Sequence, residues 1–316
     1  MSELRPRGGG GLQEAVSRRG LLRGAAAWAA AGAPLPAADA GAARQEAGAA
    51  PFDPQRPGRT RRTRFAVNVE MWWRRLPFLE RLQQAAALGF PAVEMWPWRG
   101  KDIDAVADQA RRLGLEIAQF TAWGFSPGLN DPKNHSRFVD EVGASCEIAK
   151  KLEVKRMTVV GGDDQPGMAQ AEMHQNIIDG LKLGAPVAES HGVTLILEPM
   201  NIRVDHKGHC LYGSTPAIHI CRAVGSPSVR INWDLYHMHI TEGDLCGHLR
   251  EGIDWIGYVQ LSDHPGRHEP GTGEIHYPRV LKELHTLGYR DFVGLECSPS
   301  GSEIDAARAC AHADEW

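Results

Sequence analysis

Four residues with oxygen-bearing side chains stand at or near the ends of four apolar runs in the chain. They are Glu198, Asp234, Gln260 and Glu296. Successive members are 36, 26 and 36 residues apart, so each spacing is close to one repeat of a strand and a helix. In a barrel of parallel strands, the carboxyl ends of the strands open onto one site. The pattern therefore predicts four oxygen ligands around a single point.

The chemistry that this set supports is the binding of one divalent metal ion. Three carboxylates at one point would repel one another and raise each other's pKa unless a cation lay among them. Carboxylate and amide oxygens suit Mg²⁺ or Mn²⁺ better than structural zinc, which prefers cysteine and histidine. Taken singly, each carboxylate is more often an N-cap or a loop residue, and Gln260 is as readily a core amide. The matched positions favour the metal site.

The segments that must position these residues alternate between strand and helix. Strands are predicted at 65–71, 92–96, 116–120, 156–160, 193–197, 229–233, 256–261 and 291–295. Helices are predicted at 77–88, 102–113, 135–152, 168–190, 215–224, 244–255, 279–287 and 303–311. Several helices stop at a glycine that suits a C-cap. No G-x-G-x-x-G follows the first strand, so a closed (β/α)8 TIM barrel is favoured over a Rossmann sheet.

Composition places the chain among ordinary globular proteins. Of its 316 residues, 42% are hydrophobic and 23% are charged, with a net charge of −4. This charge disfavours nucleic acid as a partner, because no global positive field exists. The six cysteines form no C-x-x-C pair, which argues against a zinc knuckle, and we interpret them as mostly buried. The sequence leaves a homo-oligomer open.

The first forty residues are predicted to be a twin-arginine signal peptide. Ser17-Arg18-Arg19-Gly20-Leu21-Leu22-Arg23 precedes an alanine-rich run, and Ala38-Asp39-Ala40 offers small residues to a signal peptidase. The apolar run is short of the roughly 20 residues of a transmembrane helix, so no stable membrane anchor is expected. A leader without a targeting role is the alternative. The predicted organisation is a signal at 1–40, a linker at 41–63 and a single barrel domain at 64–316, exported to the periplasm or beyond.

From Arg64 to about Gly301 the sequence resembles the hydroxypyruvate isomerase family of the xylose isomerase-like barrels. The most specific stretch is Arg267-His268-Glu269-Pro270, followed by Gly273-Glu274-Ile275-His276-Tyr277-Pro278. Glu198-Pro199-Met200-Asn201 and Asp234-Leu235-Tyr236-His237 also match. Ketose 3-epimerases of this superfamily usually have histidine where Gln260 stands, so the amide favours the hydroxypyruvate branch.

The resemblance implies roles for the site residues. Glu198, Asp234, Gln260 and Glu296 are implied to bind the metal, Mg²⁺ or Mn²⁺, and Glu198 and Glu296 to act also as the acid and base. We expect His237 to hydrogen-bond a substrate oxygen and Arg267 to pair with a substrate carboxylate, with a packed histidine and a solvated arginine as the alternatives. His268 and Glu274 are expected to order the same loop. Five tryptophans are expected partly in a pocket wall and partly in the core: Trp72, Trp73, Trp96, Trp98 and Trp123.

The implied reaction converts hydroxypyruvate to tartronate semialdehyde through an enediolate. Three rivals stay open. One is a ketose 3-epimerase or other sugar isomerase with the same metal chemistry. Another is an endonuclease-like relative, which the acidic net charge and the absence of extra metal ligands disfavour. The third is a non-catalytic exported sugar-binding protein, which the complete ligand set argues against.

Overall fold

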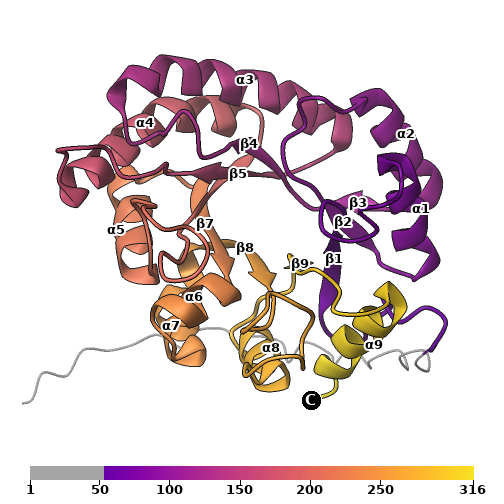
Figure 1. The fold of residues 1–316 in the computed structure, drawn as a ribbon. Coiled ribbons are helices and arrows are strands. Elements are labelled where there is room, and N and C mark those ends of the chain that lie inside the picture. Colours follow the sequence, from indigo (N-terminus) through magenta and orange to yellow (C-terminus); the bar gives the residue numbers. More distant parts are fainter. Residues whose placement is uncertain (1–52) are drawn as a thin grey trace, which may run out of the picture. The chain divides into compact units, whose positions relative to one another are not determined.

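Parallel strands surround a buried interior in the computed structural model, which describes residues 53–316. The strands are β1 (Arg64–Asn68), β2 (Ala92–Glu94), β3 (Glu116–Ile117), β4 (Phe120–Trp123), β5 (Arg156–Val160), β6 (Thr194–Glu198), β7 (Val229–Asp234), β8 (Ile256–Leu261) and β9 (Phe292–Leu295). Their order in the sheet is β3-β2-β1-β9-β8-β7-β6-β5-β4, and every pair is parallel. Figure 1 shows helices lining the outside of this ring of strands. The predicted TIM barrel is confirmed.

The third predicted strand is a bent strand that the structure divides into β3 and β4. Its first part pairs with β2, and its second part pairs with β5. Between them, the N–H of Ala118 donates to Val93 O at 2.8 Å, and Gln119 O accepts from the N–H of Met95 at 3.3 Å. The same segment thus pairs with β2 through its first part and with β5 through its second part, and this closes the ring of strands. Its length was predicted too short because Thr121 to Trp123 lie beyond the apolar run.

The helices follow the strands in the order expected of a βα repeat. They are α1 (Phe78–Ala87), α2 (Ile103–Leu113), α3 (His135–Leu152), α4 (Gln170–Ser190), α5 (Ser214–Val224), α6 (Leu235–Thr241), α7 (Leu245–Gly252), α8 (Tyr277–Thr286) and α9 (Glu303–Ala313), with short 3₁₀ turns η1 (Pro132–Asn134) and η2 (Ile253–Trp255). The predicted helix 244–255 is therefore α7 followed by η2. The glycines after four predicted helices have positive φ and end them as expected: Gly89, Gly114, Gly192 and Gly288.

Helix α6 was not predicted, and its sequence explains why. Leu235, Tyr236, His237 and Met238 are all buried, so the segment has no polar face and no amphipathic period. It begins at once after β7, where the Asp234 carboxylate accepts a hydrogen bond from the Tyr236 N–H at 2.8 Å. This cap fixes the Asp234 side chain at the barrel mouth.

The core consists of the inward faces of the helices packed on strands that are buried on both sides. All six cysteines are free, five of them are buried, and Cys246 is partly exposed. Trp72, Trp73 and Trp123 belong to this core, whereas Trp96 is exposed. Within residues 53–316, no helix is both long and apolar enough to span a membrane.

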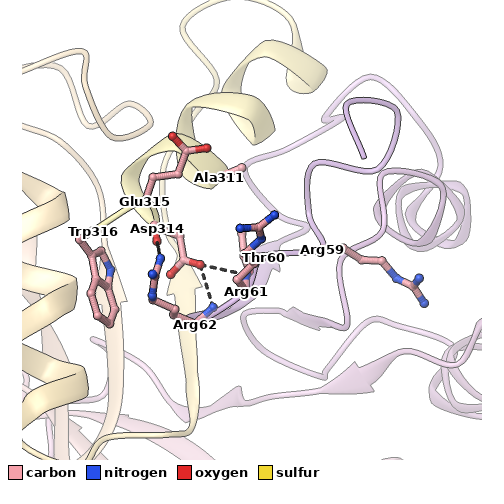
Figure 2. Close-up of a pocket in the computed structure, with 8 residues that line it drawn as sticks. All are labelled: Arg59, Thr60, Arg61, Arg62, Ala311, Asp314, Glu315 and Trp316. Atoms are coloured by element: carbon pink, nitrogen blue, oxygen red, sulfur yellow. Dashed lines mark hydrogen bonds between the residues drawn. The ribbon is translucent and has the colours of Figure 1, made fainter. Parts of the chain in front are cut away.

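The chain that leads into β1 is fastened to the end of α9. Asp314 is buried, and its carboxylate accepts from the backbone N–H groups of Arg61, Arg62 and Thr63 at 2.8–3.0 Å. Figure 2 shows the contacts of Asp314 with Arg61 and Arg62, and these residues line a cavity of about 390 Å³. The predicted linker 41–63 thus contacts the barrel over its described part, 53–63. The predicted signal peptide lies outside the described residues.

Replacing Asp314 with alanine should lower the free energy of unfolding by about 2 kcal/mol, because three partly buried N–H groups lose their acceptor. Urea unfolding measures the difference. The matched control is Glu315→Ala at the next position, which is exposed and should change stability by less than about 0.5 kcal/mol. An equal loss of unfolding free energy in both variants would mean that the Asp314 carboxylate does not stabilise the segment before β1.

Candidate active site

Strand register brings the predicted site residues to one end of the barrel. Asp234 on β7 lies opposite Gln260 on β8, and Gln260 lies opposite Gly294 on β9. Glu296 follows β9, and Glu198 ends β6. Each of the four predicted residues is buried. The repeat spacing in the sequence therefore corresponds to neighbouring positions around the barrel mouth.

Three of the four predicted residues form a tight cluster with His237. Glu198, Asp234, Glu296 and His237 each offer a ligand atom, and these atoms all lie within 4.8 Å of one another. His237 Nε2 is 3.5 Å from Asp234 Oδ2 and 3.7 Å from Glu198 Oε1. A cavity opens at this end of the barrel, and Glu198, His237, Gln260 and Glu296 all line it. Gln260 Oε1 accepts from Asn232 at 2.5 Å.

The cluster is electrostatically unfavourable for the protein by itself. Burial, together with the charges of Glu296 and Asp234, raises the pKa of Glu198 well above its usual value. Burial and the nearby Glu296 raise the pKa of Asp234 to about 7, although Arg267 opposes this shift. Both shifts arise because negative charge is brought out of water next to like charge.

The residues present fit a divalent metal ion. Asp234 Oδ2 is buried and has no hydrogen-bond partner within the described chain, so one acceptor of the cluster is left unsatisfied. An unpaired buried carboxylate oxygen is costly, and a cation among the carboxylates removes both this cost and their repulsion. The donor set is rich in oxygen, which suits a hard cation.

Asn201 sets the proton position on His237. Asn201 Oδ1 accepts from the backbone N–H groups of Val204 and Asp205 at 2.9 and 3.2 Å, which fixes the orientation of the amide. Its Nδ2 therefore donates to His237 Nδ1 at 2.8 Å. Since Nδ1 accepts, the proton of the neutral ring lies on Nε2, which faces the carboxylates. Burial, and then the charge of Arg267, hold the pKa of His237 well below its usual value. With this tautomer the Nε2–H of His237 is a hydrogen-bond donor that faces the carboxylates.

Both carboxylate oxygens of Glu296 are held by donors. Arg267 Nη2 donates to Oε2 at 2.6 Å, and Trp96 Nε1 donates to Oε1 at 2.9 Å. The same Arg267 nitrogen lies 3.8 Å from Asp234 Oδ2. Arg267 therefore contacts the carboxylate cluster, and its predicted pairing with a substrate carboxylate stays a prediction.

A buried aspartate shapes the loop that carries Arg267. The Asp263 carboxylate accepts from the N–H groups of His264, Gly271 and Ile275 at 2.8–3.0 Å. These bonds fold the loop back on itself and leave Arg267 with a φ of 56°, which is unusual for a residue with a side chain. Asp263 is thus a positioning residue that the sequence pattern did not identify.

The same loop is tied to the segment that follows Glu296. His268 Nδ1 lies 2.7 Å from Ser298 O, and Glu269 accepts from the Ser300 N–H at 2.9 Å. Glu274 instead pairs with His239 on α6 at 2.7 Å. The expected ordering roles of His268 and Glu274 agree with these contacts.

Beneath the site lies a buried carboxyl that the sequence analysis missed, Glu94 on β2. It accepts from Asn68 at 3.0 Å and from Gln260 Nε2 at 2.9 Å. Burial, and then the charge of Glu296, raise the pKa of Glu94 to about 7. A Cβ at Gly294 would lie 2.3 Å from Glu94 Oε2, so only glycine leaves room there. A glutamate inside a predicted buried strand was the sequence feature that could have revealed it.

A family model described as a xylose isomerase-like TIM barrel matches residues 82–314. The 2-oxo-tetronate isomerase of Cupriavidus necator is 34% identical over 246 residues, which cover 75% of this chain and 93% of that protein. Hydroxypyruvate isomerase of Escherichia coli is 30% identical over 243 residues, with 75% and 93% covered. A crystal structure of AP endonuclease, family 2, from Brucella melitensis superposes with a TM-score of 0.73 at 28% identity and covers 77% of this chain and 96% of that one.

The fold, the buried site and these relatives define a barrel enzyme of the isomerase class. The chain belongs to the hydroxypyruvate isomerase family of the xylose isomerase-like TIM barrel superfamily. The expected family and the expected isomerase class are both confirmed.

Metal binding should stabilise the protein more near pH 7.5 than near pH 5.5. The raised pKa values of Glu198 and Asp234 mean that both carboxyls hold protons at the lower pH and must release them to bind a cation. Mg²⁺ or Mn²⁺ at about 100 times its dissociation constant at pH 7.5 should add about 3 kcal/mol of stability at that pH, and the same concentration should add less at pH 5.5. Thermal unfolding with and without a chelator at each pH measures this increment. Equal increments at both values, or an undiminished increment in Asp234→Asn, would contradict a carboxylate site.

Nitrogen NMR of the histidine rings should show the Nε2–H tautomer for His237. Asn201 Nδ2 also donates to Asp205 Oδ2 at 2.8 Å, so Asn201→Asp is combined with Asp205→Asn to avoid placing two carboxylates side by side. The new carboxylate then accepts from His237 Nδ1, so the proton should move to Nδ1 while the backbone bonds of residues 204 and 205 persist. His174 is the internal reference, because its ring contacts Cys210 O and no residue of the cluster. An unchanged His237 spectrum in the variant would exclude this control of the tautomer.

Proposed function

We propose that this protein is a metal-dependent isomerase that moves a proton between adjacent carbons of a small α-hydroxy carbonyl compound. The reference reaction converts hydroxypyruvate to tartronate semialdehyde. The observation that carries the proposal is the pairing of Glu198 and Glu296 in one buried cluster, from β6 and from the end of β9. The relatives named hydroxypyruvate isomerase and 2-oxo-tetronate isomerase support the same reaction type.

In this mechanism Glu198 and Glu296 are the base and the acid. One carboxylate removes the proton from C3 to form the enediolate, and its partner delivers a proton to C2, while the hydroxyl proton passes from O3 to O2. The raised pKa of Glu198 suits this role, because its carboxyl can hold a proton near neutral pH. Both groups are buried, so bulk water does not quench the carbanion.

The other site residues orient the substrate. His237 is neutral with its proton on Nε2, so it donates to a substrate oxygen on which negative charge develops. Arg267 is already close to Glu296 and Asp234, and its guanidinium can pair with a substrate carboxylate. A divalent ion held by Glu198, Asp234, Gln260 and Glu296, Mg²⁺ or Mn²⁺, supplies Lewis-acid stabilisation of charge on the substrate oxygens. Asn232 and Glu94 hold the Gln260 amide in place for this role.

A sugar isomerase or ketose 3-epimerase is the second candidate, and the size of the site favours it. Residues around the cluster line a cavity of about 400 Å³, which exceeds what a three-carbon acid fills. The same acid and base would serve a ketose. The test is incubation of the metal-loaded protein with hydroxypyruvate or a ketose in deuterated water, with labelling followed by NMR. Metal-dependent labelling identifies the substrate, and silence with both favours a non-catalytic exported binding protein.

We also propose that the protein is exported by the twin-arginine route. The paired arginines, the short apolar run and the Ala-Asp-Ala site support this. Fusion of residues 1–40 to a reporter that folds in the cytoplasm tests it, with Arg18→Lys and Arg19→Lys together as the control. Export that persists in the double variant, or no export of the wild-type fusion, would remove the proposal.

Glu296→Gln should lower proton exchange by at least about 10³-fold, because an amide cannot transfer the proton. The fold should remain intact, since the amide oxygen still accepts from Arg267 or Trp96. Glu147→Gln is the matched control: this glutamate is exposed on α3, lies near His191 outside the cluster, and should leave exchange near the wild-type rate. Activity retained in Glu296→Gln would contradict the mechanism in which Glu198 and Glu296 are the base and the acid.

A further inference from the structure

The cavity at the barrel mouth has two chemically different halves. Its charged lining residues come from β6 to β9 and the loops that follow them: Glu198, Arg267 and Glu296. The half formed by β2, β4 and β5 carries no charge among the lining residues of the described chain. Its apolar members are Trp96, Pro97, Ala122, Gly124, Phe125 and Val160, and the uncharged polar residues Gln119, Thr121 and Thr158 line the same half closer to the strands. A bound molecule therefore meets charged catalytic groups on one side and an uncharged, mainly apolar wall on the other.

The cavity is larger than the reference substrate. Hydroxypyruvate has seven non-hydrogen atoms, and each takes at most the roughly 30 Å³ that a water molecule occupies in the liquid. It therefore fills about half of a cavity of about 400 Å³. The unfilled half is the one next to the apolar wall, because the reacting carbons must lie at the carboxylates.

The apolar wall does not suit a second anionic group. Among the described lining residues, Arg267 is the one with a permanent positive charge, and it already pairs with Glu296. Burial, followed by the charge of Arg267, lowers the pKa of His206, so this neighbour adds no charge at neutral pH. A carboxylate or phosphate lying against the wall would be desolvated without a partner.

Two aromatic side chains of the wall are exposed in a way that a ligand would explain. Trp96 and Phe125 are each 38% exposed and are two of the four large exposed apolar side chains in residues 53–316. Phe125 is held in position by stacking on His206, with ring centroids 5.0 Å apart. Exposed apolar groups gathered at one cavity mark a binding surface.

We propose that the substrate of this enzyme is an α-hydroxy carbonyl compound extended beyond its reacting carbons by an uncharged substituent with an apolar face, which lies against Trp96, Phe125 and Val160. This inference rests on the proposed isomerase function and specifies its substrate class. Hydroxypyruvate is then a minimal substrate that occupies only the catalytic half. The wall selects against long substrates that end in a charge.

A homologous series of α-hydroxyketones that keep the carboxylate assigned to Arg267, the 3-hydroxy-2-oxoalkanoates, tests the proposal. Hydroxypyruvate is its three-carbon member, and exchange of the C3 proton in deuterated water gives kcat/KM for chains of three to eight carbons. Each methylene that reaches the wall should raise kcat/KM about fourfold until the cavity is filled. A member of the same length with a second carboxylate at the far end of the chain should show no such gain. Exchange with hydroxypyruvate that is not improved by chain length would overturn the substrate class and leave the isomerase function standing.

A wall variant and a matched control separate specific packing from general hydrophobicity. Phe125→Ala should lower the ratio of kcat/KM between the eight-carbon and three-carbon hydroxyketones by about tenfold. Leu183→Ala removes a side chain that is 54% exposed on α4, away from the cavity, and should leave the ratio unchanged. An unchanged ratio in Phe125→Ala, or an equal fall in both variants, would also overturn the proposal.

Binding to Glu296→Gln distinguishes the two failures. Calorimetry with the eight-carbon hydroxyketone should detect binding that weakens in the double variant with Phe125→Ala. If exchange is absent with every compound but this binding is found, the proposed isomerase function is wrong and the proposed apolar subsite is supported. If neither exchange nor binding is found, the proposed subsite falls as well.

Discussion

Three carboxylates buried at one point dominate the energetics of this protein. Glu198, Asp234 and Glu296 lie almost completely out of water, and burial raises the pKa values of Glu198 and Asp234. Such a cluster is tolerated only where the surrounding structure compensates for it, and a bound cation is the most effective compensation. The burial and repulsion that make these carboxylates costly to the fold also raise their pKa values, and raised pKa values suit groups that transfer protons. Much of the loop structure around the barrel mouth can be understood from this constraint.

Compensation begins with the groups that contact the cluster. Arg267 and Trp96 satisfy both oxygens of Glu296, and Asp234 caps the helix that carries His237. A further set of contacts holds these groups in place. Asp263 shapes the Arg267 loop through three backbone N–H groups, and Glu269 ties that loop to the segment after Glu296. In the R-H-E-P stretch, Arg267 therefore contacts the site, and the next two residues, His268 and Glu269, hold its loop against the segment after Glu296.

The chemistry of His237 depends on a residue that never touches the carboxylates. Asn201 cannot turn its amide, because two backbone N–H groups hold its oxygen, and so it must donate to the imidazole. That single contact decides whether a buried histidine serves as a metal ligand or as a hydrogen-bond donor. Distance alone places His237 with the carboxylates. The direction of the hydrogen bond distinguishes its role from theirs.

The sequence by itself determined the barrel and the placement of the charged half of the site. Strand and helix periodicity predicted every βα repeat, since both elements bury a regular face, and the spacing of Glu198, Asp234, Gln260 and Glu296 placed them at the strand ends. Only the tertiary structure decided the rest. The bend between β3 and β4, the mostly buried helix α6, the carboxyl of Glu94 beneath Gln260 and the contact of Asn201 with His237 all arise from contacts between segments distant in sequence. Local periodicity carries no information about such contacts, because they depend on which side chains meet after the ring of strands has closed.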